Sequence, residues 1–155
     1  MDSCWISWNI TTDDLRRMVD ETDQNKEQIV WVLKDERPGT GNQALGVAEA
    51  LGINYHTIEL KLANLGRLPN LLLGTSLLSI TRHSRRHILP PWPDLVISAG
   101  RRAASVACYI KRRSKGRSFV CQIMYPGHIL ARGIDLIIAP NHDKRTGDNI
   151  ISVAG

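Results

Sequence analysis

Short runs of hydrophobic residues recur along the chain from residue 29 onward, and glycine, proline or charged residues bound most of them. Such runs, several of them rich in β-branched residues, are typical of parallel strands that are covered on both faces. They predict strands at Ile29–Leu33, Tyr55–Leu60, Asp94–Ser98, Phe119–Ile123, Asp135–Ala139 and Asn149–Val153.

Two of the segments between these runs have a helical pattern. Hydrophobic side chains recur there at positions i, i+3, i+4 and i+7, which places them on one face of a helix. The pattern predicts helices over residues 42–51 and 101–112, and Gly52 is placed to end the first of them. A third helix is expected within the leucine-rich segment 68–80, although Pro69 and Gly74 interrupt it.

The alternation of strands and helices determines the expected fold class. It predicts an α/β protein with right-handed crossover connections. We expect residues 30–155 to form a Rossmann-like, three-layer fold with a mainly parallel sheet of about six strands. Residues 1–29 are polar and weakly periodic, and are expected to form a poorly ordered leader or an extra helix, with residues 13–19 as its helical part.

Composition and charge narrow the choice of partners. A chain of 155 residues with 43% hydrophobic and 23% charged side chains suits one globular domain with a sizeable core. Residues 1–29 hold three basic and seven acidic side chains, a net charge of −4. Because the whole chain carries +5, the remaining 126 residues carry +9. This basic part predicts an anionic partner such as a phosphate-bearing ligand. Aromatic residues are only 5% and no nucleic-acid motif accompanies the charge, which argues against nucleic acid.

The expected location is the cytoplasm. The three cysteines, Cys4, Cys108 and Cys121, form no CxxC pair and are expected to be free thiols in a reducing compartment. The acidic start of the chain has no apolar core of the kind that a signal peptide needs. The longest uncharged stretch in the leucine-rich middle, Leu68–Thr81, has 14 residues, which is too short to span a bilayer.

The loops that follow the strands are the expected ligand sites, because open parallel sheets bind ligands beyond the carboxyl ends of their strands. The first such loop joins Lys34 to Gln43 and is rich in glycine. It is interpreted as a phosphate or substrate loop, or as a purely structural turn. A dinucleotide site is a third alternative, since Gly39-x-Gly41-x-x-Ala44 matches a loose fingerprint and Glu59 follows at a suitable distance for the ribose.

Three further strand-end loops are candidates. Gly100, Arg101 and Arg102 follow the third strand, where an arginine pair at a helix N-terminus would bind an anionic group. His142 and Asp143 follow the fifth strand and could act in acid–base chemistry, although ordinary turn residues are the alternative. The segment from Tyr125 to His128 is a weaker candidate. No metal site or bound cofactor is predicted, because the histidines lack a zinc-binding spacing.

Three segments in order carry a family resemblance. They are Asp35-x-Arg37-x-Gly39-x-x-Asn42-Gln43-Ala44-x-Gly46-x-Ala48-x-Ala50-Leu51-Gly52, then Pro93-Asp94-Leu95-Val96-Ile97-x-Ala99-Gly100-Arg101-Arg102, and finally Asp135-Leu136-x-x-x-Pro140-x-His142-Asp143 followed by Gly147-x-Asn149-Ile150-Ile151. Together they resemble the signatures of the "elongated mitochondria" mitochondrial-fission family and its bacterial relatives. The resemblance covers about residues 30–155, which correspond to the N-terminal half of family members.

The resemblance implies a function. Members resemble two-domain glycosyltransferases of the GT-B type, some bacterial members are described as predicted nucleoside-diphosphate-sugar epimerases, and plant members are associated with recruiting a dynamin-related GTPase to the mitochondrial outer surface. The second domain is absent from this sequence, so transfer from a nucleotide-sugar would need that domain. A homo-oligomer is the other expected assembly. The implied ligand-binding residues are Asp35, Arg37, Gly39, Asn42, Gln43, Gly100, Arg101, Arg102 and Asn149, with His142 and Asp143 as the catalytic pair.

A fission adaptor and a NAD-dependent epimerase are the alternative functions. An adaptor would act through a basic face, at the mitochondrial surface in a eukaryote, and would tolerate the loss of His142. An epimerase would bind NAD through Gly39, Gly41 and Glu59.

Overall fold

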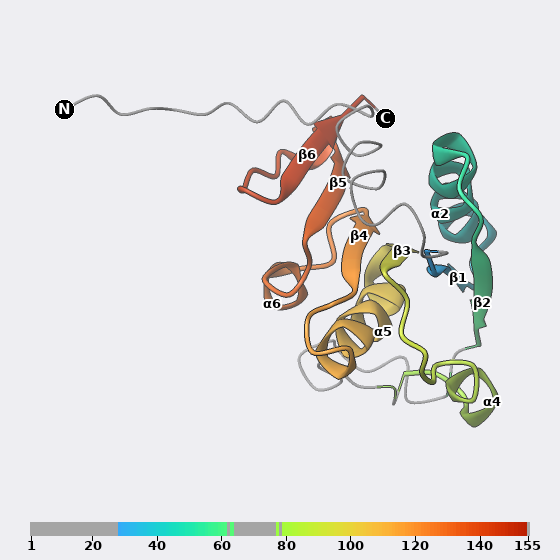
Figure 1. Cartoon of the computed structure of the whole chain (residues 1–155). Helices are drawn as coiled ribbons and strands as arrows, with labels where there is room; N and C mark the ends of the chain where they lie inside the picture. The colour runs from blue at the N-terminus through green and yellow to red at the C-terminus, as the bar shows by residue number, and fades with distance from the viewer. Residues whose placement is uncertain (1–27, 62, 64–76, 78, 155) are drawn as a thin grey trace.

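A six-stranded, fully parallel sheet forms the centre of the protein in a computed structural model that describes residues 28–61, 63, 77 and 79–154. The strands lie in the order β2-β1-β3-β4-β5-β6 (Figure 1). Their bounds are β1 Val30–Asp35, β2 His56–Leu60, β3 Leu95–Ala99, β4 Phe119–Ile123, β5 Leu136–Pro140 and β6 Ile150–Val153. The predicted α/β class and the six parallel strands are confirmed.

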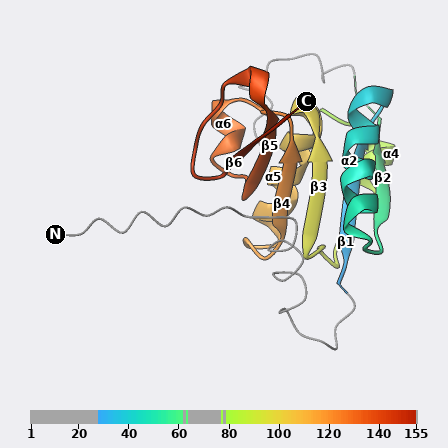
Figure 2. The same cartoon turned by 90° about the horizontal axis from the view of Figure 1, so that it is seen from above.

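Helices cover both faces of this sheet and complete the three layers (Figure 2). The helix α2, Pro38–Leu51, packs on one face, and α5, Gly100–Arg113, packs on the other. Two short helices, α4 at Arg82–Arg85 and α6 at His128–Ala131, join the layer of α5. Each long helix follows its strand almost at once, so its first turn lies at the carboxyl edge of the sheet.

The helix α2 packs closely on the sheet through small side chains. Ala44 and Ala48 are fully buried against Val30 and Val32. A Cβ atom added to Gly41 would lie 2.8 Å from Cγ of Lys34 and 3.3 Å from the carbonyl oxygen of Asp35. Glycine costs a helix about 1 kcal/mol relative to alanine, so this helix depends on its packing against the end of β1.

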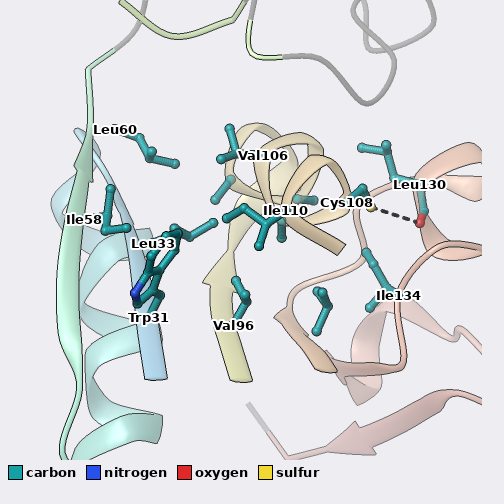
Figure 3. Close-up of a cluster of buried hydrophobic side chains, with 14 of the residues drawn as sticks. Trp31, Leu33, Ile58, Leu60, Val96, Val106, Cys108, Ile110, Leu130 and Ile134 are labelled. Carbon is teal, nitrogen blue, oxygen red and sulfur yellow. Dashed lines mark hydrogen bonds between the residues drawn. The ribbon is translucent and has the colours of Figure 1, made fainter. Parts of the chain in front are cut away.

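The larger core lies between α5 and the sheet, where Val106 and Ile110 face Leu33 and Val96 (Figure 3). Cys108 is part of this core, and its thiol lies 3.8 Å from the carbonyl oxygen of Leu130. Burial raises the pKa of Cys108 to about 11 and that of Cys121, in β4, to about 12. Both thiols are free, and they are protonated at neutral pH, so their role is in packing.

The predicted helix over 42–51 begins earlier than expected, at Pro38, because proline is favoured at the first position of a helix. Gly52 ends it in the left-handed conformation, as the sequence predicts. The helices expected at 13–19 and within 68–80 lie outside the described residues, apart from a few positions at the end of the second. Among the residues that the structure describes, no helix is long and apolar enough to cross a membrane.

Candidate functional site at the ends of β1 and β3

The strand order places a topological switch point between β1 and β3. From β1 the chain passes through α2 to β2 on one side, whereas from β3 it passes through α5 to β4 on the other side. The two connections therefore diverge at this point, which is where open α/β sheets bind their ligands. Two of the strand-end loops that the sequence singled out meet there.

The first turns of α2 and α5 are in close contact. A Cβ atom added to Gly100 would lie 2.8 Å from Cγ2 of Thr40, and the backbone of Gly100 has a φ of +79°. Glycine is needed here for both reasons, since a side chain would collide with Thr40 and would be strained at this φ. The loops after β1 and β3 thus form one continuous surface at the edge of the sheet.

This surface is electrostatically suited to an anion. The residue before each helix, Arg37 for α2 and Ala99 for α5, has no side chain that accepts a capping hydrogen bond, and neither first turn holds an acidic residue. Such helix starts present the positive end of the helix dipole and any N–H group that is left without a partner. In α2 that group belongs to Gly39, because Pro38 has no N–H group and Thr40 donates to the carbonyl oxygen of Arg37. Among the described residues, no ion pair or side-chain hydrogen bond engages the guanidinium group of Arg101 or Arg102.

A buried glutamine, Gln122, lies beneath the start of α5 and contacts Gly100. The sequence does not single it out as a site residue. Gln122 of β4 is fully buried; its Oε1 accepts a hydrogen bond of 2.6 Å from the Ser98 hydroxyl group, and its Nε2 donates to the carbonyl oxygens of Gly100 (3.1 Å) and Ile123 (2.8 Å). The signal in the sequence that could have identified Gln122 is its position as a polar residue within the hydrophobic run 119–123. Gln122 positions the start of α5 through this contact with Gly100.

The predicted residues of the first loop lie around the start of α2. Arg37 is exposed, and its carbonyl oxygen accepts hydrogen bonds from Thr40 and Gly41. Asn42 and Gln43 are exposed on the helix, whereas Asp35 is buried at the end of β1. The structure therefore brings the first and second candidate loops together.

The predicted pair His142 and Asp143 follows β5, at the same edge of the sheet but two strands from β3. At about 4.8 Å per strand, roughly 10 Å separates the two strand ends. Nε2 of His142 lies 3.7 Å from Oδ1 of Asp143, and the histidine side chain is 77% exposed. This distance is longer than a hydrogen bond, so the two groups are neighbours without a fixed mutual orientation.

The fourth candidate loop, from Tyr125 to His128, contacts Arg145, a residue that the sequence did not indicate as its partner. The hydroxyl group of Tyr125 lies 2.9 Å from Nδ1 of His128, and the guanidinium group of Arg145, from the loop before β6, lies 4.7 Å from the centre of the Tyr125 ring. These contacts satisfy Tyr125 and His128 within the protein, which favours a structural role for this loop.

Asn149 is placed away from the site. It precedes β6 and so lies at the amino edge of the sheet, opposite the strand-end loops. Its side-chain amide donates to the carbonyl oxygens of Ala131 (3.0 Å) and Ile134 (2.8 Å). The amide thereby ties β6 to the segment before β5, and the structure does not bring Asn149 to the other ligand-binding candidates.

The dinucleotide alternative loses support from the geometry. In that fingerprint the glycines form the turn between strand and helix. Here α2 begins at Pro38, so Gly39 and Gly41 lie within the helix itself. No three histidine, cysteine, aspartate or glutamate side chains are grouped to hold a metal ion in the described part of the chain.

Comparison with known proteins identifies the family. The family described as Mitochondrial fission ELM1 matches residues 38–155, a range that contains α2, α5 and the surface between their first turns. The chain belongs to this mitochondrial fission family. The family resemblance of its three strand-end segments is thereby confirmed.

A relative in Rickettsia prowazekii (strain Madrid E), described as uncharacterized protein RP120, is 38% identical over 117 residues. The match covers 75% of this chain and 32% of the relative, so the chain spans about a third of that relative's length. No solved structure matched the chain.

Proposed function

We propose that this chain is the ligand-binding part of a glycosyltransferase-like member of the fission family, and that it binds a phosphate-bearing ligand between β1 and β3. One observation carries the proposal: Gly100 and Thr40 bring two uncapped helix N-termini together beside Arg101 and Arg102. Arginine at a helix N-terminus is unfavourable because both are positive. A bound phosphate group would turn this repulsion into two attractions.

Transfer of a sugar would need further groups at the same edge of the sheet. In the proposal, a nucleotide-sugar is the phosphate-bearing substrate, and a second domain completes the site. His142 and Asp143 would orient the acceptor or take its proton, because their loop lies at the same edge of the sheet as the ends of β1 and β3. The exposed histidine has the freedom to turn toward a substrate that a second domain encloses.

Removal of the arginines tests the phosphate site. For the double variant Arg101→Ala/Arg102→Ala, we expect the affinity for inorganic pyrophosphate to fall about 10- to 100-fold, as expected for the loss of charge-assisted hydrogen bonds. Titration calorimetry at low ionic strength measures this affinity. Arg112→Ala/Arg113→Ala is the matched control, because it removes two arginine charges from the exposed other end of α5. Equal pyrophosphate affinity in the double variant and the control would contradict the proposal.

The family match favours a second candidate function, an adaptor that recruits a dynamin-related GTPase during mitochondrial fission. The two functions differ in their dependence on His142. An adaptor would bind a purified dynamin-related GTPase equally well with and without His142→Ala. A transferase formed by this chain and the proposed second domain would lose sugar transfer with the same substitution.

A further inference from the structure

We propose that a cavity at the ends of β1 and β2 binds the hydroxyl groups of a sugar that is joined to the phosphate held between β1 and β3. This inference rests on the proposed function and adds the place at which the sugar binds. The cavity has a volume of about 260 Å³, and its polar lining comes from Lys34, Asp35, Glu36, Asn42, Glu59 and Lys61. Cavities for small ligands begin at roughly 300 Å³, so this space suits a single small unit such as one sugar ring.

Asp35 is the residue that points to a ligand. Its side chain is 94% buried, since only 6% of the residue is exposed, and its Oδ1 has no hydrogen-bond partner. Buried polar atoms are nearly always paired, because an unpaired one loses its hydration without compensation. An ionised carboxylate can only accept hydrogen bonds. The missing partner must therefore be a donor.

No donor of the described residues satisfies Asp35. Lys34 and Lys61 line the same cavity, yet the ion pairs of the described chain do not include either of them with Asp35. The carboxylates of Asp35, Glu36 and Glu59 outnumber these two ammonium groups, so the cavity as a whole repels a free anion. The three carboxylates are not grouped closely enough to hold a metal ion.

Neutral hydroxyl groups fit this set of side chains best. Each hydroxyl group can donate to a carboxylate and accept from an ammonium group or from the Asn42 amide. Hydrogen bonds from a hydroxyl group to a carboxylate are short and strong, which suits the enclosed position of Asp35. Several hydroxyl groups on one small ring would engage both carboxylates and ammonium groups at once.

The two sites are close enough for one ligand. Both flank the end of β1, and neighbouring strands are separated by about 4.8 Å. The helix α2 contributes to both, through Thr40 on the side of β3 and Asn42 on the side of β2. A sugar phosphate would therefore place its phosphate group by Arg101 and its ring beside Asp35.

Calorimetry with matched probes tests the inference on the full chain. We expect at least one of glucose 1-phosphate, galactose 1-phosphate and mannose 1-phosphate to bind at least tenfold more tightly than inorganic phosphate. Asp35→Asn should abolish this preference for the sugar, while inorganic phosphate still binds. Glu49→Gln, which neutralises an exposed carboxylate of α2 outside the cavity, should keep the preference.

The possible results separate the two proposals. If inorganic phosphate binds but no sugar phosphate binds more tightly, or if Asp35→Asn keeps the preference, the sugar site is wrong and the phosphate site stands. If neither inorganic phosphate nor any sugar phosphate binds, both proposals fail. Asn42→Ala is the second variant, since it changes an exposed helix position and should also weaken the preference even where Asp35→Asn does not fold.

Discussion

Replacement of Gln122 by leucine is expected to lower the free energy of unfolding by about 3 kcal/mol, since a buried polar group left without its partner costs about 1–3 kcal/mol. Leucine has a similar volume but would leave the Ser98 hydroxyl group and the Gly100 carbonyl oxygen without the side-chain partners that Gln122 supplies. Urea unfolding followed by circular dichroism measures the change. A fall of this size corresponds to a melting temperature lower by about 10 °C.

The matched control for this substitution is Gln43→Leu. Gln43 is exposed on α2, so its replacement should change the free energy of unfolding by less than about 0.5 kcal/mol. Equal stability of Gln122→Leu and the wild-type protein would show that the hydrogen bonds to Ser98 and Gly100 contribute nothing to the fold.

Replacement of Gly100 by alanine is expected to lower the free energy of unfolding, and it tests the contact between the loops after β1 and β3. We expect a loss of about 2 kcal/mol in the free energy of unfolding, because an alanine with left-handed φ is strained by about 1–2 kcal/mol and its Cβ would collide with Thr40. Thr40→Ser removes the Cγ2 atom that causes the collision. The double variant should therefore be more stable than the sum of the two single effects predicts.

Gly46→Ala is the control for Gly100→Ala. Gly46 lies in α2 with open space around its Cα, so alanine there should raise the free energy of unfolding by about 0.5–1 kcal/mol. Additive effects of Gly100→Ala and Thr40→Ser would contradict the close approach of α2 and α5. The unfolding curves of the three single variants and the double variant provide this comparison.

Hydrophobic patterning predicted the sheet because a strand covered on both faces requires apolar side chains at nearly every position. All six predicted strands are confirmed, and their ends differ from the prediction by at most two residues. The short helices α4 and α6 escaped prediction because four residues are too few to display a helical period. Gly52 was recognisable because few other residues adopt the left-handed conformation that ends α2.

The candidate site was predictable in part. Position after a strand identified Asp35, Arg101 and Arg102, since all parallel strands end at one edge. Strand order decides which of these loops are neighbours, and local sequence does not contain it. The meeting of Thr40 with Gly100 is therefore a property of the folded chain. Asn149 stays a prediction that the structure does not group with them, because a residue just before a strand lies at the opposite edge of the sheet.

The central claim is that the ends of β1 and β3 form a single anion site. Titration of the ¹⁵N-labelled chain with inorganic pyrophosphate, followed by amide NMR spectroscopy, tests this claim most directly. We predict that the amide signals of Gly39 and Thr40 in α2 and of Gly100 and Arg101 in α5 shift together, with one dissociation constant. Shifts confined to one of the two loops, or centred on the basic segment from Lys111 to Arg117, would contradict the account.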